Sequence, residues 1–310
     1  MGRLVEGVWK DEWYDTSRTG GRFERPQSSF RRRVTADGEA GFAAEAGRYH
    51  LYVSLACPWA HRTLIMRALK GLEALVPVSV VHWRMLEHGW TFESGDGVIP
   101  DLIHGAKYLY EVYRAADPKY TGRVTTPVLW DRKRATIVNN ESSEIVRMFN
   151  SAFDRVGARE GDYYPAPLRA EIDSLNERVY ADVNNGVYRA GFATTQAAYD
   201  QAVGPLFETL DWLDARLERR QYLCGDTLTE ADVRLLPTLL RFDLVYFSHF
   251  KCNLRRIADY EHLHAYMRRL YALPGIAATF NANHAKRHYY ESHRRINPTG
   301  IVPVGPASFL

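Results

Sequence analysis

In the first half of the chain, apolar runs typical of strands alternate with a stretch typical of a helix. The apolar run His50–Ala56 predicts a short buried strand, and Cys57-Pro58 opens a helical stretch that ends before Gly71. Val76–Trp83 is a second run rich in β-branched residues. The order of strand, helix and strand predicts a βαβ unit.

A second set of elements follows an interruption of about residues 84–122, which is predicted to be an insertion or a long loop. Thr126–Asp131 and Ala135–Val138 then predict a strand pair. Asn139 and Asn140 are N-cap candidates for a helix over Glu141–Phe149. The order β-α-β followed by β-β-α predicts an α/β domain of the thioredoxin-like type.

Strand signals largely vanish beyond Pro165, and apolar residues recur at the spacing of amphipathic helices. One predicted helix carries a kink at Gly204-Pro205. A second begins at the capping box of Thr229–Asp232 and reaches about Phe247, and a third runs from Asp259 to Leu273. The fold class is therefore an α/β thioredoxin-like N-terminal domain followed by an all-α C-terminal domain.

The predicted organisation has four parts. Residues 1–46 are polar but aromatic-rich, which indicates an irregular arm lying on the protein body. The thioredoxin-like domain covers residues 47–160, the all-helical domain residues 165–285, and an irregular tail residues 286–310.

Composition narrows the possible partners. The net charge is +3, and the basic triplets, Arg31–Arg33 and Arg132–Arg134, are short and far apart, so no nucleic-acid partner is expected. The sequence contains no run of about eighteen apolar residues, so no membrane-spanning helix is expected. The first six residues lack the apolar stretch of a signal peptide, so a cytoplasmic location is expected.

Three cysteines without close spacing, Cys57, Cys224 and Cys252, argue against a disulfide framework or a zinc site. His284 and His288 lie four residues apart, but no carboxylate pattern accompanies them, and no metal is expected. Cys224 and Cys252 are expected to be small, partly buried side chains.

Cys57 is the candidate nucleophile. It lies where a strand ends and a helix begins, and the free N–H groups and dipole of a helix N-terminus favour a thiolate. A two-cysteine redox motif would place a second cysteine at position 60, but that residue is Ala60. A mixed disulfide at Cys57 would therefore be released by a small external thiol, which points to glutathione.

Two further features fit a glutathione site. Thr126-Pro127 begins a strand where a thioredoxin-like domain holds a cis proline, whose neighbouring backbone groups can pair with an extended peptide. Ser142 in the first turn of a helix suits a carboxylate, and Glu141 suits an ammonium group.

With the motif Cys57-Pro58-Trp59-Ala60-His61-Arg62, the sequence resembles the glutathionyl-hydroquinone reductases, the Xi class of the glutathione transferase superfamily. The likeness runs nearly end to end. Its other motifs are Trp13–Asp15, Gly20–Phe23, Glu87–Phe92, Gly122–Asp131, Asn140–Ser142, Asn184–Tyr188, His288–Tyr290 and Ile296–Ile301.

The resemblance implies an activity, a site and an assembly. Cys57 would attack the sulfur of a glutathionyl-hydroquinone, and a second glutathione would release glutathione disulfide. The residues matching the family's proton donors are Tyr188 and Tyr289, with Tyr290 as a neighbour that also remains a candidate. The positions matching its glutathione site are Trp90, Arg123, Val124, Glu141 and Ser142. The family is dimeric, so a homodimer is expected.

Two alternatives remain open. An omega-like thiol transferase or dehydroascorbate reductase would use the same single-cysteine chemistry. A glutathione-transferase-like scaffold without catalysis would carry a Cys57 thiol that alkylates only above about pH 8. A conjugating transferase is disfavoured, because it would use a Ser or Tyr hydroxyl at this place.

Overall fold

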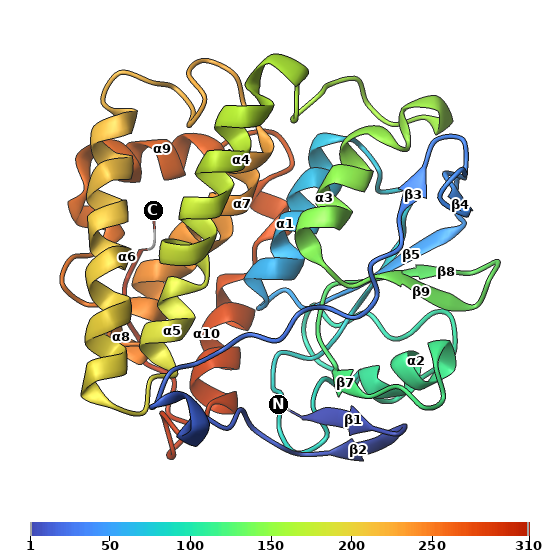
Figure 1. The fold of residues 1–310 in the computed structure, drawn as a ribbon, viewed down its shortest axis with the longest axis horizontal. Coiled ribbons are helices and arrows are strands. Elements are labelled where there is room, and N and C mark those ends of the chain that lie inside the picture. The colour runs from blue at the N-terminus through green and yellow to red at the C-terminus, as the bar shows by residue number, and fades with distance from the viewer. Residues whose placement is uncertain (1, 309) are drawn as a thin grey trace. The chain divides into compact units, whose positions relative to one another are not determined.

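The computed structural model describes residues 2–308 and 310, and the chain divides into two compact units (Figure 1). The first unit comprises the chain up to Trp13, residues Gln27–Gly161 and residues Ala278–Ser292. The second comprises Tyr14–Pro26, Asp162–Ala277 and the chain from His293 onward. The N-terminal arm therefore contributes to both units.

A four-stranded sheet organises the first unit, in the order β6-β5-β8-β9. The central strand β5 (Tyr49–Val53) is buried along its whole length and runs parallel to β6 (Val78–Val80). It runs antiparallel to β8 (Val128–Asp131), which pairs in turn with β9 (Thr136–Asn139). Helices α1 (Pro58–Leu69) and α3 (Ser142–Ser151) pack against each other (Figure 1). This arrangement confirms the predicted thioredoxin-like domain.

The interruption before β8, which the sequence predicts to be an insertion or a long loop, is not wholly a loop. It contains helix α2 (Leu109–Ala116), which buries Leu109, Val112 and Tyr113 at helical spacing. These side chains join the core formed by Tyr52 and Trp130 of the sheet. The neighbouring glycines and aspartates hide this short helical pattern from a sequence window.

The arm is also more regular than predicted. Strand β1 (Arg3–Val5) lies between β2 (Val8–Lys10) and β7 (Gly122–Arg123), and β3 (Val34–Thr35) pairs with β4 (Phe42–Ala43). Because Leu4 pairs with Gly122, the partner of β1 is far away in the sequence. A local hydrophobic pattern does not reveal such a pairing.

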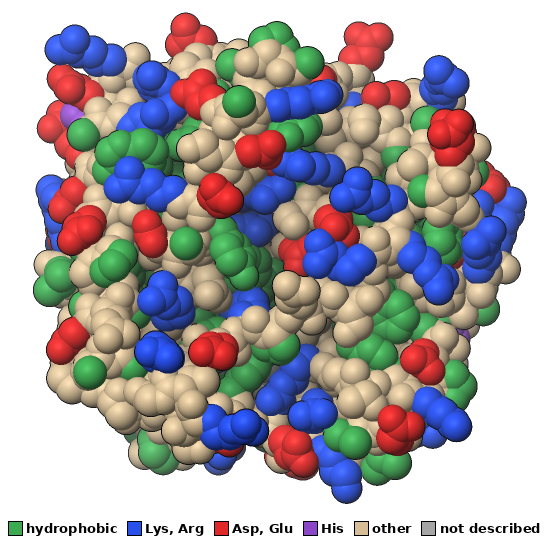
Figure 2. All heavy atoms as spheres, in the orientation of Figure 1, with side chains coloured by type: hydrophobic (Ala, Val, Ile, Leu, Met, Phe, Trp, Pro, Cys, Tyr) green, Lys and Arg blue, Asp and Glu red, His purple; other side chains and the backbone are tan. Residues whose placement is uncertain are grey.

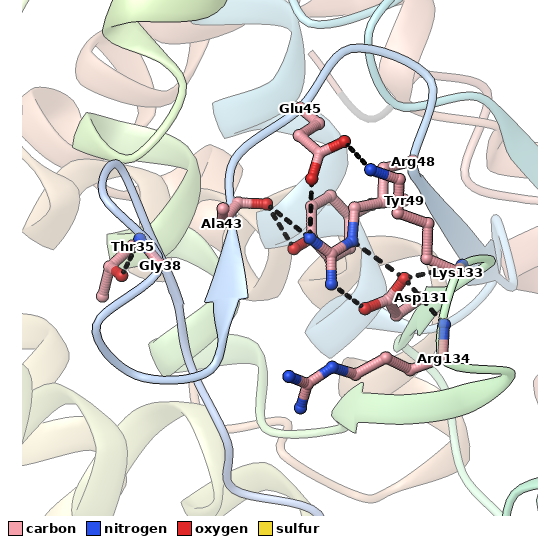
Figure 3. Close-up of polar contacts among 9 residues, drawn as sticks. All are labelled: Thr35, Gly38, Ala43, Glu45, Arg48, Tyr49, Asp131, Lys133 and Arg134. Atoms are coloured by element: carbon pink, nitrogen blue, oxygen red, sulfur yellow. Dashed lines mark hydrogen bonds and ion pairs between the residues drawn. The ribbon is translucent and has the colours of Figure 1, made fainter.

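A group of charged residues holds the edge of the sheet where β5 begins (Figure 3). The Arg48 guanidinium donates from Nε to Asp131 Oδ1 at 3.0 Å and from Nη2 to Asp131 Oδ2 at 2.5 Å. It also pairs with Glu45, which contacts Lys133. Burial opposes ionisation of Asp131, but hydrogen bonds from Arg48 and the Lys133 N–H hold its pKa below the ordinary value.

The second unit is helical, as predicted. Helix α4 (Arg169–Arg178) continues through a π-helical segment, Val179–Asn184, into α5 (Gly186–Gly191). Helix α6 (Gln196–Leu217) contains Pro205. Helix α7 (Glu230–Arg241) is followed by a π-helical segment at Phe242–Tyr246, then by α8 (Phe247–His249) and α9 (Glu261–Tyr271).

The predicted capping box is present, with Asp232 accepting from the Thr229 N–H at 2.8 Å. Helix α10 (Ala282–Ser292) belongs to the first unit and extends past residue 286, where the tail is predicted to begin. Short 3₁₀ turns occur at Ser17–Thr19, Asp154–Val156, Ala166–Leu168, Ile257–Asp259 and Ala277–Thr279. Among the described residues, no helix is both long and apolar enough to span a bilayer.

Candidate functional site

Three segments of the first unit meet at one edge of its sheet. Strand register pairs Tyr52 with Val128 and Leu129 with Asn139. The end of β5, the start of β8 and the end of β9 therefore share this edge. Cys57 follows β5, Thr126-Pro127 precedes β8, and Glu141-Ser142 follows β9. The fold thus brings together motifs that are distant in the sequence, since Cys57 lies more than sixty residues before Thr126.

Cys57 is the N-cap residue of α1, and Pro58 is the first residue of the helix. Its thiol is half-buried and makes no capping hydrogen bond. In the thiol form, Sγ lies 3.4 Å from the Thr126 carbonyl oxygen, to which it donates. An α-helix leaves its first N–H groups without acceptors inside the helix, so this position can stabilise a thiolate.

The Thr126-Pro127 peptide bond is cis, as predicted. Thr126 is only 5% exposed, and its hydroxyl oxygen has no hydrogen-bond partner in the part of the chain that the structure describes. The same edge therefore offers both a carbonyl that contacts the Cys57 sulfur and a buried hydroxyl with unused capacity. The sequence motif pointed to the backbone here, and the hydroxyl is an addition.

Glu141 and Ser142 lie at the start of α3. Glu141, and not Asn139 or Asn140, is the N-cap residue, and its carboxylate accepts from the Ser143 N–H at 3.2 Å. Asn140 is engaged elsewhere, because its amide binds the Phe30 N–H and the Tyr113 hydroxyl.

Ser28 of the arm donates its hydroxyl to Glu141 Oε2 at 3.1 Å. Ser142 is 2% exposed, and its hydroxyl has no hydrogen-bond partner among the described residues. Buried polar atoms are nearly always hydrogen-bonded in folded proteins, so an unsatisfied hydroxyl at a helix N-terminus is notable. Its position matches that expected for a group that binds a carboxylate.

The two basic residues after Cys57 have structural contacts. His61 is fully buried, with Nε2 at 2.8 Å from Thr279 Oγ1 and its ring stacked on Phe280. The Arg62 guanidinium lies over the Trp59 ring at 4.6 Å. Both side chains therefore help to fix helix α1, whose N-terminus carries Cys57.

The predicted glutathione positions outside this edge lie in the same unit. Arg123, in β7, donates to the carbonyl oxygens of Glu12 and Trp13, the latter at 3.1 Å. Its guanidinium thus binds the arm backbone. Val124 follows directly and is buried, and Trp90 is buried with its ring stacked on His288 at 4.8 Å.

Tyr289 and Tyr290 are buried residues of α10 in the first unit. Helix α10 is held by the residues that follow β6. The Trp83 indole donates to Glu291 Oε2 at 3.2 Å, and the Met85 N–H donates to Ser292 Oγ at 3.0 Å. On the same helix, His284 Nε2 lies 2.6 Å from the Asp96 carbonyl oxygen. Burial lowers the pKa of this histidine. These contacts fix α10, and with it both tyrosines, in the first unit.

Tyr188 lies on α5 in the second unit, inside an aromatic cluster. The rings of Phe192, Tyr246 and Phe250 surround it at centroid distances of 5.7, 6.1 and 5.5 Å. Phe23 of the arm adds a fourth ring at 6.5 Å. The π-helical segment Val179–Asn184 precedes this tyrosine, and such segments often occur at functional sites.

The other two cysteines differ from Cys57. Burial raises the pKa of the Cys224 thiol to about 11, and it raises the pKa of the Cys252 thiol further. Neither thiol is poised to react. Within residues 2–308 and 310, no group of three or more His, Cys, Asp or Glu side chains could hold a metal ion.

The molecular face in Figure 2 shows Lys and Arg side chains interspersed with Asp and Glu side chains. This face therefore presents no field of a single sign.

Family models and solved structures define the class of protein. A model described as the glutathione S-transferase N-terminal domain matches residues 56–152, and one described as the C-terminal domain matches residues 196–269. A glutathione-bound structure of a glutathione transferase homologue from Escherichia coli K-12 has a TM-score of 0.92 and 54% identity, and covers 99% of this chain and 96% of its own. The Xi-class enzyme of Phanerochaete chrysosporium has a TM-score of 0.90 and 51% identity, with 93% and 99% covered.

Curated relatives narrow the class. A glutathionyl-hydroquinone reductase of Sphingobium chlorophenolicum is 62% identical over 310 residues, covering 100% of this chain and 98% of the relative. One from Escherichia coli is 58% identical, covering 99% and 95%. The chain belongs to the glutathionyl-hydroquinone reductase family, the Xi class of the glutathione transferase superfamily. The predicted family and two-part fold are thereby confirmed.

Proposed function

We propose that this protein reduces S-glutathionyl-hydroquinones to hydroquinones with glutathione as co-substrate. The observation that carries the proposal is the half-buried Cys57 thiol at the N-terminus of α1, beside the Thr126 carbonyl and on the same sheet edge as two unpartnered hydroxyls. The names of the relatives agree with an enzyme that acts on glutathione-linked substrates.

The reaction has two steps at one sulfur atom. The Cys57 thiolate attacks the sulfur of the glutathionyl group, an S–S bond forms, and the bond from that sulfur to the ring carbon breaks. The electron pair of the broken bond stays on the ring, which gains a proton and leaves as the hydroquinone. A glutathione thiolate then attacks the Cys57 mixed disulfide, releases glutathione disulfide and regenerates the Cys57 thiolate.

Glutathione is held by the residues of the sheet edge and their neighbours. The Ser142 hydroxyl and N–H at the start of α3 bind the γ-glutamyl carboxylate, and Glu141 binds the ammonium group. The backbone of Val124 pairs with the tripeptide, while Trp90 and Arg123 line the rest of its site. Arg123 also keeps the arm in place through Glu12 and Trp13, so its fork serves two purposes.

Tyr188 and Tyr289 supply the proton that the departing ring requires. Phenols suit this role because they can donate to a ring oxygen or carbon at neutral pH. Tyr290 is adjacent to Tyr289 and is a further contact with the substrate. The burial of Tyr188 among the rings of Phe192, Tyr246 and Phe250 supports its contact with a planar ring.

The deciding experiment is incubation with glutathionyl-menadiol and glutathione, with chromatography of the products. Free menadiol and glutathione disulfide should appear in equal amounts, and Cys57→Ala should produce neither. Tyr188→Phe should slow menadiol release while Cys57 still forms an adduct with glutathione disulfide. Absence of menadiol with the unaltered protein would refute the proposed reaction.

A thiol transferase or dehydroascorbate reductase is the second candidate. A relative from Schizosaccharomyces pombe, named a glutathione S-transferase omega-like protein, is 50% identical over 300 residues. The lone thiol of Cys57 also fits this chemistry. A higher kcat/KM for mixed disulfides or dehydroascorbate than for glutathionyl-menadiol would favour it.

We further propose a homodimer in the cytoplasm, with domains at residues 47–160 and 165–285. The dimer rests on the family resemblance, and the reducing location on the low, odd cysteine count. Light scattering of the purified protein tests the dimer, and fractionation of cells that express it tests the location. Limited proteolysis between residues 160 and 165 tests the domain boundary.

A further inference from the structure

A cation from the arm lies against the proposed proton donor Tyr188. The centre of the Arg25 guanidinium is 4.9 Å from the centroid of the Tyr188 ring and 5.3 Å from that of Phe23. Arg25 Nε also donates to Asn185 Oδ1 at 3.0 Å. Asn185 is the N-cap residue of α5, the helix that carries Tyr188. One side chain of the arm thus holds both the helix start and the tyrosine ring.

The surroundings of Tyr188 make this charge important. The tyrosine is 8% exposed, and Phe23, Phe192 and Phe250 contribute apolar rings around it. A phenol that releases its proton there leaves a negative charge with little water to solvate it. A neighbouring cation in such surroundings interacts more strongly than it would in water.

Among the described residues, the other titratable groups around this ring include two phenols and a histidine pair. One phenol is Tyr14, whose ring packs on Phe23 with the centroids 4.8 Å apart. The other phenol is Tyr246, from the π-helical segment after α7. Its ring centroid lies 6.1 Å from that of Tyr188. His249 and His293 lie behind Phe250 and Phe192, with His249 Nε2 at 3.2 Å from His293 Nδ1. Among these groups Arg25 is the one that places a guanidinium over the Tyr188 ring.

We propose that Arg25 is a positioning residue for proton transfer by Tyr188, an inference that rests on the proposed function. In the transfer, the O–H bond of Tyr188 breaks, a bond forms between the proton and the departing ring, and the electron pair remains on Tyr188 Oη. The guanidinium stabilises this phenolate and gives up no proton itself. The phenolate regains its proton from water before the next turnover.

The first test is the rate of hydroquinone release in three variants across pH. Arg25→Met removes the cation and keeps most of the side-chain length, so release at pH 7 should slow about tenfold. The alkaline limb of the pH–rate profile of Arg25→Met should move to higher pH, because the Tyr188 phenol holds its proton more tightly. Arg25→Lys keeps a cation and should stay within about threefold of the unaltered protein. Arg255→Met is the matched control, since Arg255 lies 4.0 Å over Tyr260, outside the proposed site.

Two results of this test would overturn the inference. One is an Arg25→Met profile that coincides with that of the unaltered protein. The other is an equal loss in Arg25→Lys and Arg25→Met without any shift along the pH axis, which would indicate a purely structural role. Circular dichroism and the Cys57 adduct with glutathione disulfide show whether each variant is folded.

A second test needs no turnover. Tyrosine labelled with ¹³C at Cζ reports ionisation by NMR, and Tyr188→Phe identifies the signal of residue 188. That signal should titrate at lower pH in the unaltered protein than in Arg25→Met. If glutathionyl-menadiol is not reduced at all, the proposed function fails, while this titration still decides whether Arg25 acts on Tyr188. An unchanged titration would reject the role of Arg25 even in an active enzyme.

Discussion

The two edges of the four-stranded sheet differ in how their buried polar groups are satisfied. Where β5 begins and β8 ends, both oxygens of Asp131 are paired with Arg48 (Figure 3). Where β5 ends and β8 begins, the Thr126 and Ser142 hydroxyls have no partner, and Cys57 is half-buried. The first edge uses its polar groups for stability, and the second leaves two hydroxyls unsatisfied, as the proposed glutathione site requires.

The sharpest way to test this contrast is to remove the thiol. Cys57→Ala should lower the turnover of glutathionyl-menadiol by more than about a thousandfold, because no other thiol near this edge can replace it. The free energy of unfolding should change by less than about 1 kcal/mol, since the side chain is half-exposed and caps nothing. Urea titration and product chromatography measure the two quantities. A large loss of stability would mean that the second edge is structural too.

The opposite edge should respond in the reverse way. Arg48→Met leaves the Asp131 carboxylate buried without its cation and should reduce the free energy of unfolding by about 3–5 kcal/mol. The turnover per folded molecule should stay unchanged, because Arg48 lies at the other end of β5. Urea unfolding and active-site titration with iodoacetamide check both statements. A variant as stable as the parent would show that this ion pair is dispensable.

Two buried serines offer a matched pair. Ser142 has no hydrogen-bond partner, so Ser142→Ala should leave stability within about 0.5 kcal/mol and weaken glutathione binding about tenfold. Ser79 donates to the Pro100 carbonyl at 2.7 Å, so Ser79→Ala should lose about 1–2 kcal/mol of stability and keep its affinity. Calorimetry with glutathione and thermal unfolding separate the two. If Ser142→Ala and Ser79→Ala lost glutathione affinity equally, Ser142 would not be part of the binding site.

The smallest effect concerns pH. The pKa of Asp131 is lowered in the folded protein, although burial opposes this shift, because Arg48 stabilises its carboxylate. The stability that the pair provides is present above the unfolded value of about 3.9 and is lost as pH falls through the folded value. The difference in unfolding free energy between the parent and Arg48→Met should therefore shrink below about pH 4. A difference that stays constant down to pH 2 would contradict this.

Most of the architecture could be predicted, because its signals are local. The strand before Cys57, the helix after Pro58 and the Thr229 capping box each depend on residues within a few positions. The proline after Thr126 marks the cis bond. Helix α2 was not predicted because it is short. The pairing of β1 with β7 was not predicted because it joins residues that are far apart in the sequence, such as Leu4 and Gly122. Local periodicity carries no information about such distant partners.

The site could be predicted only in part. Motifs indicated Cys57 and Ser142, but not that the Ser142 hydroxyl lacks a partner, which depends on packing around it. Arg25 lies in a stretch whose sequence is dominated by charged and turn-forming residues. Its contact with Tyr188 needs the folded arm, because the two residues are far apart along the chain. The only trace in the sequence is the aromatic Phe23 beside it.

The different depths of the three cysteines make the protein convenient for probing. Cys224 and Cys252 are buried, and burial raises the pKa of both thiols, so thiol reagents at neutral pH should modify Cys57 selectively. A fluorophore or spin label can thus be attached at one defined point without engineering the chain. Intact-mass spectrometry of the labelled protein then counts reactive centres directly, and each occupied molecule reports a single event at the start of α1.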